Sequence, residues 1–104
     1  MTKFLHVGVP TTRVQPDETF LDGLKVYITD PAKHPYFYEY LRFVDGTPMP
    51  DCITSQPHVA YQVDDLDAAL KDCELLFGPM QSDEHTRIAF AMHHNLILEL
   101  TEVK

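Results

Sequence analysis

Two histidines and two glutamates occupy matching places in the two halves of this 104-residue sequence. His6 lies in the segment LHVGV and His58 in PHVAY, while Glu39 lies in YEYL and Glu99 in LELT. Each half therefore opens with a stretch that holds a histidine and closes with one that holds a glutamate. Two imidazoles and two carboxylates form a donor set for a divalent metal, and the mixture of nitrogen and oxygen suits Zn, Ni, Fe, Mn or Co.

The strands expected around these residues assign each of them to a face. Alternation over 57–63 places His58 opposite three apolar side chains, and alternation over 96–102 does the same for Glu99. Glu39 shares its face with aromatic and leucine side chains. A carboxylate on such a face is costly unless it is paired, protonated or bound to a metal. If the halves pack about a pseudo-two-fold axis, the four side chains converge in one cavity.

The elements that must position these residues follow from the pattern of apolar residues. Strands are expected at 3–9, 24–29, 36–44, 57–63, 86–92 and 96–102. A helix is expected from Asp64 or Asp65 through Phe77, ended by Gly78 and Pro79. The stretch 10–23 is expected to be mostly loop, and 45–56 a connector between half-modules of about 1–50 and 51–104. The histidine-to-glutamate spacing is about eight residues shorter in the first half, which fits the loss of about two helical turns.

Composition limits the kinds of partner. The net charge is −8 and 44% of the residues are hydrophobic, which fits a single domain with a modest core. No basic cluster is present for nucleic acid or an anionic membrane surface. The sequence shows neither a secretory segment nor an apolar run long enough to span a bilayer, so a cytoplasmic protein is expected. Cys52 and Cys73 form no C-x-x-C motif and are expected to be reduced thiols.

The remaining histidines are given no part in the metal site. His93 and His94 lie in the turn between the last two expected strands, where exposed polar residues are usual. His34 and His85 lie in expected loops. The site therefore rests on the repeated histidine and glutamate positions alone.

Three segments, FLHVGV, PHVAYQVDDLDAAL and RIAFAMHHNLILEL, resemble the vicinal oxygen chelate superfamily, which includes the glyoxalases and extradiol dioxygenases. The resemblance implies an α+β fold, with paired βαβββ modules forming a curved mixed sheet over a single domain, 1–104. The first module lacks most of its helix, and whether it also lacks a strand stays open. Carried over by position, the implied metal ligands are His6, Glu39, His58 and Glu99. The sequence departs from the family in its last turn, which reads MHHN.

The resemblance implies a metal-dependent lyase or isomerase acting on a small oxygenated substrate. His6 and His58 would be fixed ligands, and Glu99 or Glu39 would act as ligand and general base in turn. Ring-cleaving dioxygenation and thiol transfer to a phosphonate are disfavoured, the latter because no Lys and Arg cluster is present. The alternative is a non-catalytic small-molecule binding protein on the same fold. A homodimer is expected from the aromatic strand face around Tyr38, although pairing of the halves within one chain stays open.

Overall fold

The computed structural model describes residues 1–104, and the chain divides into two compact units. The first unit is His6–Pro57, and the second consists of Met1–Leu5 together with His58–Lys104. Strand β1 (Lys3–Pro10) begins in the second unit and continues into the first. None of the helices is long and apolar enough to cross a membrane.

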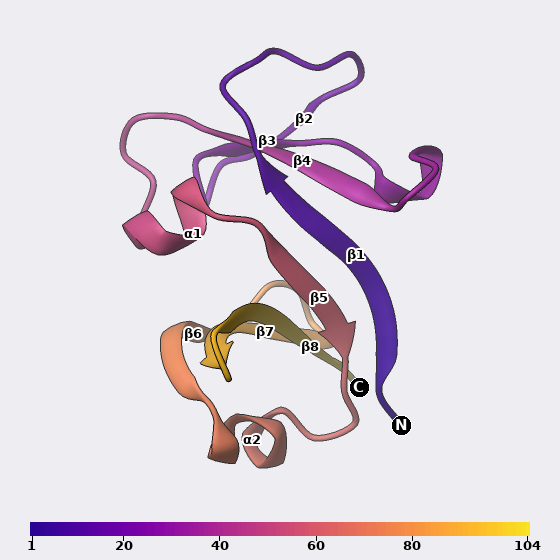
Figure 1. The fold of residues 1–104 in the computed structure, drawn as a ribbon, viewed down its shortest axis with the longest axis vertical. Helices are drawn as coiled ribbons and strands as arrows, with labels where there is room; N and C mark the ends of the chain where they lie inside the picture. The colour runs from indigo at the N-terminus through magenta and orange to yellow at the C-terminus, as the bar shows by residue number, and fades with distance from the viewer. The chain divides into compact units, whose positions relative to one another are not determined.

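The first unit is a mixed sheet with the strand order β2-β3-β4-β1 (Figure 1). It contains β2 (Thr19–Leu21), β3 (Val26–Ile28), β4 (Tyr38–Phe43), the short 3-10 helix η1 (Pro31–Lys33) and α1 (Asp51–Ser55). Strands β2, β3 and β4 are antiparallel neighbours, whereas β4 and β1 are parallel. No helix separates β1 from β2, so the expectation of a first module lacking most of its helix is confirmed.

Strand register gives the sheet of the first unit two distinct faces. Gly8 is opposite Glu39 and Pro10 is opposite Leu41, so these side chains share what we call the glutamate face. Its buried residues include Leu41, which is 6% exposed, and Val26, which is 2% exposed. The opposite face carries an aromatic cluster made by His34, Tyr36, Tyr38 and Tyr40. Tyr38 and Tyr40 therefore share a strand face as expected, whereas Tyr36 lies in the turn before β4.

The second unit has the order strand, helix, strand, strand, strand. It contains β5 (His58–Gln62), α2 (Leu66–Ala69), the 3-10 helix η2 (Leu70–Asp72), β6 (Glu74–Gln81), β7 (Thr86–His93) and β8 (Leu96–Val103). The strand order is β5-β8-β7-β6, with β5 and β8 parallel and the other neighbours antiparallel. Leu66, Ala89 and Leu100 form the buried core on the helix side of this sheet.

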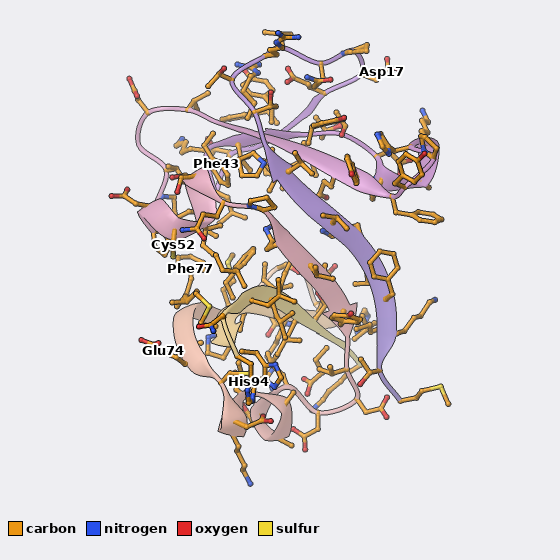
Figure 2. The ribbon with its side chains drawn as sticks, viewed as in Figure 1. Asp17, Phe43, Cys52, Glu74, Phe77 and His94 are labelled. Carbon is orange, nitrogen blue, oxygen red and sulfur yellow. The ribbon has the colours of Figure 1, made fainter.

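The prediction that the helix continues through Phe77 is wrong for the second half of that range. Asp65 does cap α2, accepting a hydrogen bond from the Ala68 backbone N–H at 3.1 Å, but the α-helix ends at Ala69. Residues 74–81 instead form β6, which pairs with β7 through irregular register (Figure 2 labels Glu74 and Phe77 on this strand). The spacing of the apolar side chains in this stretch fits a helix as well as a strand. The hydrogen bonds to β7 select the strand.

Gly78 and Pro79 therefore lie inside a strand and do not end a helix. Gly78 has a φ of +91°, and a Cβ at this position would lie 2.9 Å from the backbone oxygen of Ile88. Glycine is thus required at this close approach of the β6 and β7 backbones. The order in the second unit is βαβββ, with one strand more than the apolar pattern indicated.

Two smaller corrections concern the first unit. The stretch expected to be mostly loop contains β2, so no strand is missing from the first module. The expected connector contains α1, whose Ile53 is fully buried.

The expected turn between the last two strands is confirmed, because His94 and Asn95 both have positive φ, 49° and 73°, as a two-residue hairpin turn requires. The α+β class with paired modules is therefore confirmed.

Candidate metal centre

In the first unit, the parallel pairing of β1 with β4 brings His6 to Glu39. Glu39 is opposite Gly8, and His6 precedes Gly8 by two residues, so His6 and Glu39 lie on the same face. Nε2 of His6 lies 3.2 Å from Oε1 of Glu39, and the two side chains are only 12% and 15% exposed. A largely buried imidazole and carboxylate therefore meet on the glutamate face of this unit.

In the second unit, the parallel pairing of β5 with β8 brings His58 to Glu99. Glu99 is opposite Ala60, and His58 precedes Ala60 by two residues. Nε2 of His58 lies 3.1 Å from Oε1 of Glu99, within hydrogen-bonding distance, with the carboxylate as acceptor. The His58 side chain is 1% exposed and that of Glu99 is 14% exposed. The structure thus gathers the four residues singled out from the sequence into two pairs.

The two pairs share one construction, residue for residue. Each unit places its histidine two positions before the residue opposite the glutamate, on parallel first and last strands. The residue opposite the glutamate is small in both, Gly8 in one and Ala60 in the other. The internal repeat suggested by the sequence therefore extends to the strand register and to the Nε2–Oε1 distance of each pair.

An aromatic side chain holds the imidazole of His58 in place. Phe90 on β7 is opposite Glu99 on β8, and its ring meets the His58 ring edge-on, with centroids 5.1 Å apart and planes at 90°. Phe77 contacts Phe90 in turn, with ring centroids 6.5 Å apart. Packing of this kind restricts rotation of the imidazole and fixes the direction of its nitrogens.

A third glutamate on these strands, Glu102, plays a structural part that the sequence pattern did not reveal. Its side chain is 3% exposed and accepts hydrogen bonds from the Leu66 backbone N–H at 2.9 Å and from Nε of Arg87 at 3.1 Å. The Leu66 N–H, followed by the Arg87 guanidinium, holds the pKa of Glu102 below its usual value. Glu102 therefore ties the start of α2 to β8.

The other histidines and the cysteines lie outside these pairs. His93 is 38% exposed, with Nε2 3.6 Å from Oδ2 of Asp72. His94, labelled in Figure 2, is exposed in the hairpin turn. His34 stacks on a tyrosine, and His85 is 69% exposed. Both cysteines are free thiols, and burial raises the pKa of Cys73. The ligand candidates therefore remain His6, Glu39, His58 and Glu99.

Comparison with known proteins finds similar solved structures but no matching family model and no matching curated protein. Among solved structures, a hypothetical protein from Bacillus halodurans C-125 is similar over 99% of this chain and 95% of that one, with a TM-score of 0.63 and 14% identity. Methylmalonyl-CoA epimerase from Mycobacterium tuberculosis is similar over 98% of this chain and 88% of its own, with a TM-score of 0.57 and 16% identity. The chain therefore has the glyoxalase-like α+β fold.

Proposed function

We propose that this protein is a metal-dependent lyase or isomerase of the vicinal oxygen chelate superfamily, acting on a small oxygenated substrate. The observation that carries the proposal is the repeated His–Glu pair, built in the same register and with nearly equal Nε2–Oε1 distances of 3.2 and 3.1 Å. The likeness to an epimerase, which is an isomerase by name, supports the choice of reaction class. We take the two pairs to act together, within one chain or across a homodimer.

The donor set fits a divalent ion. Two imidazole nitrogens and two carboxylate oxygens suit Zn, Ni, Fe, Mn or Co better than a calcium or thiolate site. Within each pair the nitrogen and oxygen atoms lie 3.2 and 3.1 Å apart, close enough for both to bind one ion. The same distance suits a hydrogen bond between imidazole and carboxylate, as His58 and Glu99 form in the absence of an ion.

In the proposed chemistry the histidines act as metal ligands and a glutamate acts as the general base. A bound ion would supply Lewis-acid stabilisation of negative charge on the substrate oxygens. Glu99 or Glu39 would remove the proton from the carbon next to a carbonyl group, and a glutamate would return it. His6 and His58 would stay fixed, because their strands, and for His58 the Phe90 ring, leave them little freedom. Return of the proton to the opposite face of the carbon would complete an epimerisation.

Proton exchange tests this function directly. Methylmalonyl-CoA, the substrate in the epimerase's name, should lose the proton between its two carbonyl groups to deuterated water when the protein and a divalent metal are present. Loss of a general base lowers such rates by about 10² to 10⁴, so Glu99→Gln should reduce exchange by that order. The matched control is Glu84→Gln, which removes an exposed glutamate and should leave the exchange rate unchanged.

Two results would count against an enzyme of this class. If no proton exchange occurs with any of the five metals, the proposal that the protein acts on this substrate is wrong. If in addition the protein binds no metal, the alternative of a non-catalytic small-molecule binding protein is favoured.

A further inference from the structure

The first unit has no helix between β1 and β2, and the face of its sheet opposite Glu39 is built differently from that of the second unit. In the second unit α2 covers the corresponding face, where Leu66 packs against Leu100 on β8. On β4 the two residues that flank the glutamate are tyrosines, Tyr38 and Tyr40, where β8 has leucines. These tyrosines line a cavity of about 210 Å³.

Two segments form the walls of this cavity, and a carboxylate holds each of them in place. One wall is the loop before β2, where Glu18 is 8% exposed and accepts hydrogen bonds from Nε and Nη2 of Arg42 on β4, at 2.9 and 2.7 Å. The other wall is η1, whose N-cap residue Asp30 accepts a hydrogen bond from the Ala32 backbone N–H at 2.9 Å. Both walls are held by bonds within the chain, so a ligand need not order them.

Three groups of the lining can donate hydrogen bonds to a ligand. Nδ1 of His34 accepts a hydrogen bond from the Tyr36 backbone N–H at 3.1 Å, so in the neutral ring the hydrogen is on Nε2, which lies 3.5 Å from the Tyr40 hydroxyl oxygen. The Thr29 hydroxyl oxygen accepts a hydrogen bond from the Tyr40 backbone N–H at 2.9 Å. The hydroxyl hydrogens of Tyr40 and Thr29 therefore remain for a ligand. Lys33 is the third donor, and its ammonium group forms no ion pair within the chain.

Three other groups of the lining are acceptors. The Asp17 carboxylate forms no hydrogen bond or ion pair within the chain (Figure 2 labels Asp17 on the loop before β2). Asp30 uses Oδ1 at the start of η1, which leaves Oδ2. The Gln15 side chain donates through Nε2 to the Arg13 carbonyl at 3.2 Å, which leaves Oε1 as an acceptor. The lining thus holds two carboxylates and one ammonium group that are not paired with each other.

The charges and the size of the cavity together define the ligand. Lys33 and the two hydroxyl donors match a carboxylate, whereas the two aspartates match an ammonium group. The cavity has the volume of about seven water molecules, and sites for drug-sized molecules begin at about 300 Å³. A molecule that carries both charges in so small a volume is a small zwitterion.

We infer that this cavity binds a free α-amino acid. The ammonium group of the amino acid lies toward Asp17 and Asp30. Its carboxylate lies toward Lys33 and the hydroxyls of Thr29 and Tyr40, and its side chain contacts the aromatic cluster. The inference does not rest on the proposed function, because the cavity lies on the face opposite the glutamate face and uses no residue of the His–Glu pairs.

L-Phenylalanine and L-alanine are the probes, and the protein is first freed of metal so that an amino acid cannot bind through a metal ion. In ¹H–¹⁵N spectra the probes should shift the resonances of Asp17, Thr29, Lys33 and Tyr40. Phenylalaninamide, which lacks the carboxylate, and N-acetylphenylalanine, which lacks the ammonium group, should each bind about fivefold more weakly than phenylalanine. Glucose, which is neutral, should shift none of these resonances.

Two variants with matched controls test the charged groups. Lys33→Gln should lower the affinity for phenylalanine about fivefold and leave that for phenylalaninamide unchanged, because the amide has no carboxylate. Asp17→Asn should lower the affinity for phenylalanine by a similar factor and leave that for N-acetylphenylalanine unchanged. Lys71→Gln and Asp45→Asn, which alter exposed charges outside this cavity, should change none of these affinities.

Three results would overturn the inference. The first is that neither amino acid moves these resonances at millimolar concentration. The second is that phenylalaninamide and N-acetylphenylalanine bind as tightly as phenylalanine, since the aromatic ring alone would then explain binding. The third is that Lys71→Gln or Asp45→Asn lowers the affinity for phenylalanine as much as the variants inside the cavity do. None of these measurements involves metal or proton exchange, so the proposed function can fail while this site stands.

Discussion

Replacing Phe90 with leucine should destabilise the second unit and weaken metal binding at His58 together. Phe90 is 5% exposed and makes edge contacts with the rings of His58 and Phe77. Each such contact contributes about 0.5–1.5 kcal/mol beyond simple burial. Leucine keeps most of the apolar burial but forms neither ring contact, so the variant should lose about 1–3 kcal/mol of unfolding free energy.

Two measurements follow from this loss. In a domain of this size each kcal/mol shifts the melting temperature by about 4–8 °C, so the metal-free variant should melt about 10 °C lower than the wild type. Titration calorimetry with Zn or Ni should show an affinity about tenfold weaker, because residues that orient a metal ligand typically contribute about that much. The ring of His58 would then be free to turn away from Glu99.

Ile88→Val is the matched control, because Ile88 is on the same strand and face as Phe90 and is 9% exposed. It should cost about 0.5–1.5 kcal/mol of stability while metal affinity stays the same. The reasoning is refuted if Phe90→Leu melts at the wild-type temperature, or if Ile88→Val lowers the metal affinity by the same factor as Phe90→Leu.

Four further results are expected. Glu102→Gln should be less stable than the wild type at neutral pH, and the difference should vanish as pH falls from the usual glutamate value of 4.5 through the lowered pKa of Glu102, as acid-dependent melts would show. Glu99→Gln should keep its fold but show a much smaller metal-induced rise in melting temperature, and equal rises would remove Glu99 from the site. Because burial raises its pKa above the usual 9.0, Cys73 should react slowly with iodoacetamide at pH 7, and peptide mass analysis should find it largely unlabelled. Sedimentation at micromolar concentration should give twice the chain mass, whereas the mass of one chain would contradict a homodimer.

The pairing of the four ligand candidates could be anticipated because strands obey a simple period. Parity alone places His58 and Glu99 on the face away from the leucines of β8, and the repeat carries the same relation to His6 and Glu39. The register that sets Gly8 opposite Glu39 and Ala60 opposite Glu99 could not be anticipated. Register between strands distant in sequence is set by tertiary pairing.

The elements that sequence reasoning missed are those whose local signals are ambiguous. The stretch 74–81 has apolar residues that suit a helix and a strand equally, and only its pairing with β7 selects the strand. The helix α1 has only five residues, too few to show a period, and is fixed by burial of Ile53. Glu102 resembles any polar residue near a strand end, because its partner Leu66 is 36 residues away.

The metal content of the purified protein tests the central claim most directly. Elemental analysis after loading with Zn or Ni and removal of excess metal should find one ion per chain, whether the two pairs join within a chain or across a homodimer. A double variant, His6→Ala with His58→Ala, should retain none, while His85→Ala, which alters an exposed histidine, should retain one. A wild-type protein that holds no metal, or a double variant that still holds one ion per chain, would contradict the repeated His–Glu pair as a metal centre.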